Sequence, residues 1–367
     1  MFKTRRDRLK NILKLEGYDI VLIDSPWNLY YYTGFTGGEA IVILSVDQDK
    51  KDLKRGYIIT DSRYYEQVER ECSDLTLIRL ENITYIEGLN ELLNKDRNKE
   101  NYKIVIEENM HLLRYLKLFH ALDKDQLVAD SKSINSCRMV KDEEELFLLR
   151  RAEEIGVEAF QHILTILKPG ISEAEISLEL EFYMKKQGAA KLSFDTIVAS
   201  GANSSMPHAQ VTERLIQQGD FVTMDFGCVY KGYCSDMTRT VAVGEPTEEM
   251  RKVYQIVLDA NLRAMEGIRA GVKCSDIDAL ARDYIKEQGY GKYFGHGLGH
   301  SVGLEIHEEP RFSPTCHDIT KVNMAITNEP GIYLPGRFGV RIEDLTLVQE
   351  NGCVVLSAGA EKELLIL

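Results

Sequence analysis

Two segments of the chain, GISEAEISLELEFYMKKQG (170–188) and GVKCSDIDALARDYIKEQG (271–289), share one pattern. At a constant offset of 101 residues, six of their 19 positions are identical, including the glycines at both ends. Each copy reads as a helix closed by a glycine, and each is followed by an aromatic stretch and a histidine-bearing segment, SMPHA or FGHGLGH. The pattern predicts a duplicated half-domain with a cleft between its two halves. Chance similarity between two amphipathic helices is the alternative.

The remainder of the chain predicts a second domain in front of this one. A length of 367 residues exceeds what one core usually supports. The first part alternates helical patterns with the strand patterns YDIVLID, AIVILSV, GYIIT and YKIVIEE, which is typical of an α/β domain with a buried sheet. The aromatic segment 28–38, NLYYYTGFTGG, is interpreted as a buried turn. A boundary at the polar stretch 131–136 gives domains 1–132 and 133–367, and Asp142 with Glu145 predicts a capping box that opens a long helix.

Composition excludes several classes of function. The formal net charge of −13 argues against a nucleic-acid or anionic-membrane partner, because phosphate binding needs a basic excess. No run of about 18 apolar residues exists, so no membrane span is expected. The seven cysteines are scattered and form no C-x-x-C pair, which favours reduced thiols and a cytoplasmic location.

A first pair of acids lies in DFVTMDFGCVYKGYCSDMTRTVAV (220–243), which reads as a hairpin with Lys231-Gly232 at its turn. In that register Asp225 faces Thr238, and Asp225 and Asp236 become diagonal neighbours about 7–8 Å apart. Gly227, opposite Asp236, is expected to leave room for a bulky group. Two solvated acids are the alternative, but the apolar neighbours favour a buried face.

A second pair lies in TNEPGIYLPGRFGVRIEDLTLV (327–348). Glu329 ends one apolar strand, and Glu343 is predicted inside another, on the same face as Arg341. An ion pair with arginine would account for one glutamate only. Four carboxylates cannot all stay ionised in one low-dielectric cleft without compensating cations. Together with a histidine they form an oxygen-rich set that suits two divalent metal ions.

Histidine is supplied by GHGLGHSVGLEIHEEP (295–310), which contains His296, His300 and His307. The spacing within this segment does not select one of the three as a ligand.

The motifs VTMDFG, CSDMTRT, GHSVGLEIHEEP, TNEPGIY and VRIED, in this order, resemble those of the M24 or pita-bread metallopeptidases, which include methionine aminopeptidase, aminopeptidase P and prolidase. The first domain, with NLYYYTGF, resembles the creatinase/aminopeptidase P-type N-terminal domain. The resemblance covers nearly the whole chain. It implies an α/β (α+β) fold, with a creatinase-like α/β domain over 1–132 and a pita-bread catalytic domain with pseudo-twofold internal duplication over 133–367.

The same resemblance implies a role for each site residue. Two divalent cations, most simply Mn²⁺ with Co²⁺, Fe²⁺ and Zn²⁺ as alternatives, would be held by Asp225, Asp236, His300, Glu329 and Glu343. In the family, the ligand histidine stands seven residues before the histidine of the His-Glu pair, so the resemblance makes His300 the ligand. His296 is then expected to lie beside the ligands or in a loop, with a direct metal ligand as the alternative. The implied catalytic residues are His208 and His307, which contact substrate, Glu329 as proton acceptor and donor, and Arg341.

The activity implied is that of an Xaa-Pro peptidase of aminopeptidase P type, which hydrolyses an N-terminal Xaa-Pro bond with a hydroxide that bridges the metals. One alternative is a prolidase restricted to Xaa-Pro dipeptides. Arg311 resembles an arginine that some prolidases use near the dipeptide carboxylate, and a salt bridge at the rim of the site is the other interpretation of this residue. A non-catalytic binding protein of the same fold is less expected, because all five ligand positions are filled. The resemblance also implies a homodimer and a peptide or dipeptide substrate with proline second.

Overall fold

The computed structural model describes residues 1–46, 56–81, 84–93, 102–122 and 126–367. The chain folds into two compact units, Met1–Arg138 and Met139–Leu367. The boundary expected between residues 132 and 133 falls inside helix α6 (Ser131–Met139), near the end of the first unit.

The first unit is built on a six-stranded mixed sheet in the order β4-β3-β2-β1-β5-β6. The pairs β1/β2 and β2/β3 are antiparallel, whereas β1/β5, β3/β4 and β5/β6 are parallel. The four strand patterns quoted above correspond to β1, β2, β3 and β5. The bounds are α1 Phe2–Leu15, β1 Ile20–Ile23, α2 Pro26–Thr33, β2 Ile41–Ser45, β3 Tyr57–Thr60, α3 Tyr65–Glu71, β4 Thr76–Arg79, α4 Tyr85–Leu93, β5 Ile104–Ile106, α5 Leu112–Ala121 and β6 Leu127–Ala129.

The segment interpreted as a buried turn is mainly helical, so that prediction was wrong. Helix α2 starts at a Ser25 cap followed by proline and ends at Gly34, whose φ of 79° closes it. Tyr31 and Tyr32 are buried, and their hydroxyls donate to main-chain carbonyls of α6. These start and stop signals outweigh the low helix propensity of three consecutive tyrosines.

The second unit consists of two similar halves, each with two long helices followed by strands. The expected capping box of Asp142 and Glu145 opens α7, and the repeated helices α8 and α10 are each followed by a left-handed glycine, Gly188 and Gly289. The first half contains α7 Glu143–Leu164, α8 Glu173–Lys186, β7 Lys191–Leu192, β8 Ile197–Ser200, the 3-10 helix η3 Gly201–Ser205, β9 Asp220–Phe226, β10 Cys228–Tyr230, β11 Tyr233–Cys234 and β12 Met237–Val243.

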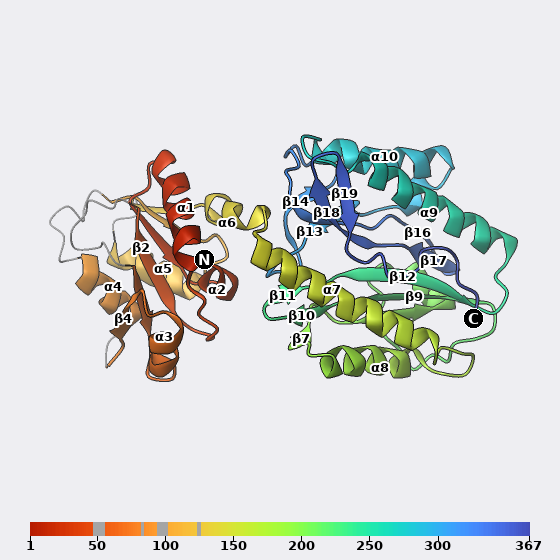
Figure 1. Cartoon of the computed structure of the whole chain (residues 1–367), viewed down its shortest axis with the longest axis horizontal. Helices are drawn as coiled ribbons and strands as arrows, with labels where there is room; N and C mark the ends of the chain where they lie inside the picture. Colours follow the sequence, from red (N-terminus) through yellow and green to blue (C-terminus); the bar gives the residue numbers. More distant parts are fainter. Residues whose placement is uncertain (47–55, 82–83, 94–101, 123–125) are drawn as a thin grey trace. The chain divides into compact units, whose positions relative to one another are not determined.

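The second half follows the same plan. It contains α9 Glu248–Gly267, α10 Cys274–Glu287, the 3-10 helix η4 Gly291–Tyr293, β13 Gly299–Ser301, β14 Glu308–Phe312, β15 Ala325–Asn328, β16 Gly331–Leu334, β17 Phe338–Arg341, β18 Asp344–Gln349 and β19 Gly352–Val355. The principal sheets are β12-β9-β8 and β14-β13-β15-β18-β19. In Figure 1 the α7/α8 pair and the α9/α10 pair lie on opposite sides of the strands. This is the duplicated arrangement that the two similar helices predicted.

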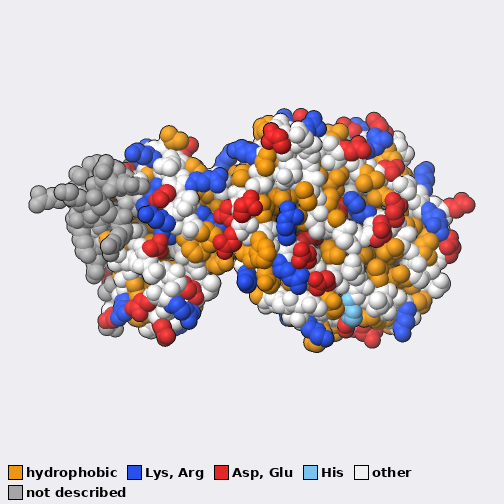
Figure 2. All heavy atoms as spheres, in the orientation of Figure 1, with side chains coloured by type: hydrophobic (Ala, Val, Ile, Leu, Met, Phe, Trp, Pro, Cys, Tyr) orange, Lys and Arg blue, Asp and Glu red, His pale blue; other side chains and the backbone are white. Residues whose placement is uncertain are grey.

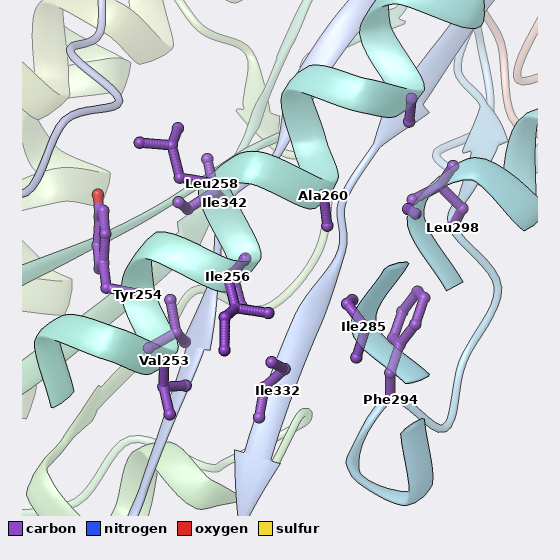
Figure 3. Close-up of a cluster of buried hydrophobic side chains, with 14 of the residues drawn as sticks. Val253, Tyr254, Ile256, Leu258, Ala260, Ile285, Phe294, Leu298, Ile332 and Ile342 are labelled. Atoms are coloured by element: carbon purple, nitrogen blue, oxygen red, sulfur yellow. The ribbon is translucent and has the colours of Figure 1, made fainter. Parts of the chain in front are cut away.

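Apolar side chains hold the helices of the second half against its strands. Figure 3 shows one cluster, in which Val253, Ile256 and Ala260 of α9 lie near Ile332 of β16 and Ile285 of α10. All five belong to one buried cluster. A separate cluster holds α7 and α8 against the strands of the first half. Each half therefore has its own core, and the strands that lie between them are held rigidly from two sides.

The C-terminal segment pairs with β12. The amide of Ala242 donates to the carbonyl of Leu365 (2.9 Å), and the amide of Leu367 donates to the carbonyl of Ala242 (2.9 Å). The segment that follows β19 thus returns to the hairpin that contains the predicted aspartates.

The surface carries both signs of charge. On the face drawn in Figure 2, lysine and arginine side chains are interspersed with aspartate and glutamate. Within the residues that the structure describes, no helix combines the length and apolar character needed to cross a bilayer.

Candidate metal centre

The hairpin of β9–β12 has the predicted register. Asp225 pairs with Thr238, Tyr230 pairs with Tyr233, and Lys231-Gly232 forms the turn with φ values of 46° and 93°. Asp225 and Asp236 consequently point to the same region of the unit, where both line one cavity. The prediction of two converging aspartates is confirmed in its geometry.

The space expected beside Gly227 is occupied by the main chain. A Cβ atom at this position would lie 2.0 Å from the carbonyl oxygen of Ser235. The ladder is interrupted here, between the β9/β12 and β10/β11 pairings. Glycine is needed because the hairpin bends at this point, and not because a bulky group lies opposite Asp236.

Glu343 does not lie inside a strand, contrary to the prediction. Strand β17 ends at Arg341 and β18 begins at Asp344, so Glu343 lies in a two-residue break. Within the break, the amide of Ile342 donates to the carbonyl of Pro330. The amide of Glu343 donates instead to the carbonyl of Thr238 in β12 (3.1 Å). The change of hydrogen-bond partner brings the Glu343 side chain to the hairpin with the two aspartates.

Three buried side chains form a group that could hold a metal ion. Ligand atoms of Asp236, His300 and Glu343 all lie within 4.8 Å of one another. His300 Nε2 is 3.4 Å from Asp236 Oδ2 and 3.4 Å from Glu329 Oε1. Glu329 directly follows β15, so it comes from the second half of the unit, whereas Asp236 comes from the first.

Hydroxyl groups orient the two glutamates. Thr238 Oγ1 donates to Glu343 Oε2 (2.6 Å), and Thr327 Oγ1 donates to Glu329 Oε1 (3.1 Å). Each of these donors engages one oxygen of its carboxylate. Both threonines are fully buried strand residues, so the carboxylates are held by rigid elements.

The electrostatics of the group call for cations. Burial, followed by repulsion from neighbouring carboxylates, raises the pKa of Asp236 and of Glu343 well above their usual values. Burial also raises the pKa of Glu329 to about 8. Burial lowers the pKa of His300 to about 3, so its imidazole is neutral and able to bind a metal.

One further observation fits a metal-binding group. None of the described residues donates a hydrogen bond to the buried Asp225 Oδ1, while Asp225 Oδ2 accepts from Arg341 Nη2 (2.6 Å). A buried carboxylate oxygen without a donor is costly unless a cation binds it. The donor set of four carboxylates and one imidazole suits hard or borderline divalent ions.

Arg341 is buried and makes contacts with all three of its guanidinium nitrogens. Besides Asp225, it donates to Thr238 Oγ1 (3.0 Å), to the hydroxyl of Tyr333 (2.8 Å) and to the carbonyl of Pro207 (3.1 Å). It therefore links β9, β12 and the loop that carries His208.

All eight predicted site residues line a single cavity of about 940 Å³. His208 and His307 are exposed, whereas the four acids and His300 lie deeper, and His300 and His307 stack edge to face with their ring centres 4.4 Å apart. His296, expected beside the ligands or in a loop, also lines the cavity, and its Nδ1 lies 4.0 Å from Glu329 Oε2. The residues brought together are His208, Asp225, Asp236, His300, His307, Glu329, Arg341 and Glu343.

Two supporting features were not predicted. Glu153 of α7 is fully buried, and its Oε2 accepts from the amide of Asp236 (3.2 Å). Its position on the apolar stripe of α7, beside the buried Leu149, Ala152 and Gly156, is a signal that could have singled it out. Burial raises the pKa of Glu153 to about 8.

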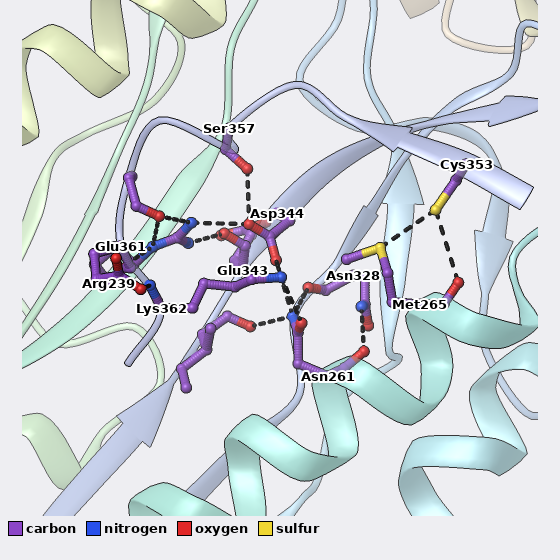
Figure 4. A network of polar contacts seen from close by, with 12 residues as sticks. Arg239, Asn261, Met265, Asn328, Glu343, Asp344, Cys353, Ser357, Glu361 and Lys362 are labelled. Carbon is purple, nitrogen blue, oxygen red and sulfur yellow. Dashed lines mark hydrogen bonds and ion pairs between the residues drawn. The ribbon is translucent and has the colours of Figure 1, made fainter. Parts of the chain in front are cut away.

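The second feature is a buried polar network behind Glu343, shown in Figure 4. Arg239 donates to the carbonyls of Glu343 and Ala360 and forms an ion pair with Asp344 (2.8 Å). Asp344 also accepts from Lys362 (3.0 Å). Two further donors to Asp344 are Asn261 and Ser357.

The duplicated unit and its cavity lined by acids and histidines agree with the sequence comparisons, which place the chain among the metallopeptidases. Residues 148–350 match metallopeptidase family M24, and residues 5–140 match the Creatinase/Prolidase N-terminal domain. The chain belongs to metallopeptidase family M24, of the type that carries a creatinase-like N-terminal domain and a pita-bread catalytic domain.

Individual relatives match over nearly the entire chain. The present chain is 37% identical to the Xaa-Pro dipeptidase of Pyrococcus furiosus, over 99% of this chain and 100% of that protein. The solved structure of an Xaa-Pro dipeptidase from Bacillus anthracis is 40% identical, with a TM-score of 0.92 and 100% of both chains covered. That of an X-Pro aminopeptidase from Thermotoga maritima is 35% identical, with a TM-score of 0.86 and 98% and 99% of the two chains covered.

Proposed function

We propose that the protein is a dinuclear metal-dependent Xaa-Pro peptidase that acts preferentially on Xaa-Pro dipeptides. The observation that supports this most directly is the convergence of all eight predicted site residues on one cavity. This preference for dipeptides differs from the expectation based on the motifs, in which an activity of aminopeptidase P type came first and prolidase was the alternative. It is supported by the dipeptidases of P. furiosus and B. anthracis, which match at 37% and 40% identity.

The two cations would be held by Asp225, Asp236, His300, Glu329 and Glu343. When bound, divalent cations supply a water of lowered pKa and polarise the carbonyl of the scissile bond. The Asp225 oxygen that lacks a donor is a natural ligand atom, because Arg341 already orients the other oxygen of that carboxylate. Mn²⁺ is our proposed native ion, and Co²⁺, Fe²⁺ and Zn²⁺ share the same ligand preferences closely enough to replace it.

The protein's own residues divide the remaining tasks. Glu329, whose carboxylate lines the cavity and accepts from Thr327, would take a proton from the attacking water and return it to the leaving proline nitrogen. His208 and His307 donate hydrogen bonds to the substrate from the exposed part of the cavity. Partial desolvation at the cavity wall, and then Arg311, lower the pKa of His307, so it acts as a neutral donor. Arg341 positions Asp225 and the His208 loop through its contacts with Asp225 and Pro207.

An aminopeptidase P activity on longer peptides is the second candidate. The cavity of about 940 Å³ extends past the acids to Ser177 and Glu181 of α8, which gives space beyond a dipeptide. The X-Pro aminopeptidase of T. maritima, 35% identical, is consistent with it.

The deciding experiment compares Gly-Pro with Gly-Pro-Pro on chelator-stripped protein reloaded with Mn²⁺ or Co²⁺. We expect Gly-Pro to be hydrolysed faster, with the release of glycine, the product common to both substrates, measured by chromatography. Faster hydrolysis of Gly-Pro-Pro would assign the aminopeptidase instead. Loaded, folded protein that cleaves neither substrate would exclude both.

Location and assembly follow as further proposals. We propose a cytoplasmic homodimer. The free thiols of Cys72, Cys228, Cys234, Cys274, Cys316 and Cys353 support a reducing compartment. Sedimentation of the native protein tests the dimer.

A further inference from the structure

A carboxylate outside the metal centre organises the loop that carries His208. Glu173, the first residue of α8, has no solvent exposure. Its Oε1 accepts from the amide and the hydroxyl of Ser200, both at 2.7 Å. Its Oε2 accepts from Asn203 Nδ2 (2.9 Å) and from the amide (3.1 Å) and hydroxyl (2.6 Å) of Thr212. Five donors thus converge on one side chain.

Four of these donors come from the two ends of the segment 200–212, and the fifth, Asn203, lies within it. Ser200 ends β8 and Thr212 lies four residues after His208, so Glu173 joins the two ends of the segment between them. The main chain strengthens this connection, because the amide of Ala174 donates to the carbonyl of Thr212 (3.2 Å). The loop is therefore fixed to the first turn of α8.

His208 depends on this loop for its position. Among the residues that the structure describes, none makes a hydrogen bond with the imidazole of His208, and the side chain is exposed at the cavity. A side chain without its own partners is placed by its backbone. Displacement of a catalytic group by about 1 Å can reduce a rate about 100-fold.

We propose that Glu173 is a positioning residue for the reaction, acting through the loop 200–212 to hold His208 against the substrate. This inference rests on the proposed function, in which His208 contacts the substrate.

The other half of the unit uses a comparable device. Asp278 of α10 accepts from the amide of Leu298 (3.0 Å) and pairs with Arg282 (2.7 Å). Arg282 in turn donates to the carbonyl of His296 (2.7 Å). In each half, a buried carboxylate on the second helix fixes a histidine-bearing loop at the cavity, which indicates a shared functional requirement.

The test is a double-mutant cycle of Glu173→Gln and His208→Ala in the full-length, Mn²⁺-loaded protein. Glutamine keeps the shape of the side chain but replaces one carboxylate oxygen with an NH2 group. Depending on which oxygen is replaced, the NH2 group faces the two donors of Ser200 or the three donors of Asn203 and Thr212. We expect kcat/KM for Gly-Pro to fall about 10-fold in E173Q and about 100-fold in H208A. The double variant should be no slower than H208A, because both changes act through one group.

A matched control is Glu175→Gln. Glu175 lies in the same turn of α8, but within the part of the chain that the structure describes its carboxylate accepts only from Ser172, in the capping box of the helix. E175Q should retain wild-type kcat/KM. Metal content and far-UV circular dichroism should be unchanged in all variants, because neither Glu173 nor His208 belongs to the metal-binding group.

A second variant guards against misfolding of E173Q. Thr212 is exposed, and Thr212→Val keeps the shape of the side chain but removes the hydroxyl that donates to Glu173 and accepts from the amide of Arg214 (3.2 Å). T212V should lower kcat/KM several-fold and show the same non-additivity with H208A. Wild-type kinetics in both E173Q and T212V, or effects that multiply with H208A, would overturn the inference. Inactivity of the loaded wild type on every Xaa-Pro substrate would instead refute the proposed function.

Discussion

The ion pair between Arg239 and Asp344 provides a sharp test of how the catalytic unit is held together (Figure 4). The side chain of Arg239 is 1% exposed and that of Asp344 is 0% exposed. Burial would raise the pKa of the Asp344 carboxyl, but Arg239 and then Lys362 outweigh it and lower the pKa. The pair is therefore charged inside the core, and removal of one partner leaves a buried charge.

The perturbation is Arg239→Met, which keeps much of the apolar stem and removes the guanidinium. Breaking a buried pair from one side costs about 3–5 kcal/mol. The carbonyls of Glu343, Ala360 and Glu361 lose this donor as well, whereas the carbonyl of Thr238 loses the guanidinium but keeps the amide of Glu343. We therefore expect R239M to lower the free energy of unfolding by about 4 kcal/mol.

Lys362→Met is the matched control. Its side chain is 21% exposed and makes one ion pair with Asp344, so its loss should cost only about 1 kcal/mol. The double variant R239M/D344N should be more stable than R239M alone, because the amide removes the uncompensated charge.

The assay is urea unfolding of chelator-treated protein at pH 7, followed by far-UV circular dichroism. The single tryptophan, Trp27, lies in the first unit, so its fluorescence separates the transition of that unit from that of the catalytic unit. If R239M were within about 1 kcal/mol of wild type, or if K362M cost more than R239M, the reasoning about the buried pair would be refuted.

Three other predictions concern the metal centre. Asp236→Ala should abolish hydrolysis and lower the bound metal measured by elemental analysis, and full activity in this variant would contradict the proposed mechanism. In metal-free protein, the pKa of Glu329 rises from 4.5 to about 8 on folding, so the folded state binds more protons; its contribution to stability is complete below pH 4.5 and is lost as the pH rises to about 8. The melting temperature of chelated wild type should therefore fall more steeply over this range than that of Glu329→Gln, and equal slopes would count against the raised pKa. Gly227→Ala places a Cβ 2.0 Å from the carbonyl oxygen of Ser235 and should cost about 1–3 kcal/mol in thermal unfolding experiments, with reduced metal content; a wild-type melting curve would mean that the bend is not required.

Local rules predicted much of this fold. The capping box of Asp142, the glycine stops at Gly188 and Gly289 and the turn at Lys231-Gly232 all depend on a few neighbouring residues, and all are observed. The register of the hairpin follows directly from its turn, which is why the convergence of Asp225 and Asp236 could be predicted.

The errors occurred where distant segments decide the backbone. The strand that was expected to contain Glu343 is broken because its amide pairs with Thr238, more than 100 positions earlier in the chain. Gly227 has its role because Ser235 passes close to it, and a pattern of alternating residues does not show such a bend. Neither contact leaves a signal in the neighbouring sequence.

The residues of the centre could be named from motifs, whereas their supports could not. Glu153, Glu173 and Arg239 act through hydrogen bonds to main-chain groups of other elements. Every residue has the same main-chain groups. The type of residue at a position therefore does not reveal whether its amide or carbonyl bonds to a distant side chain. Only a polar residue on an otherwise apolar face, as at Glu153, gives a hint.

The duplicated plan of the catalytic unit has an evolutionary consequence. Asp225 and Asp236 come from the first half, while His300, Glu329 and Glu343 come from the second. An ancestor that consisted of one such half could have surrounded a cation only by pairing with an identical copy across a twofold axis. Gene fusion would have freed the two copies to diverge, one keeping its aspartates and the other acquiring the imidazole and the glutamates.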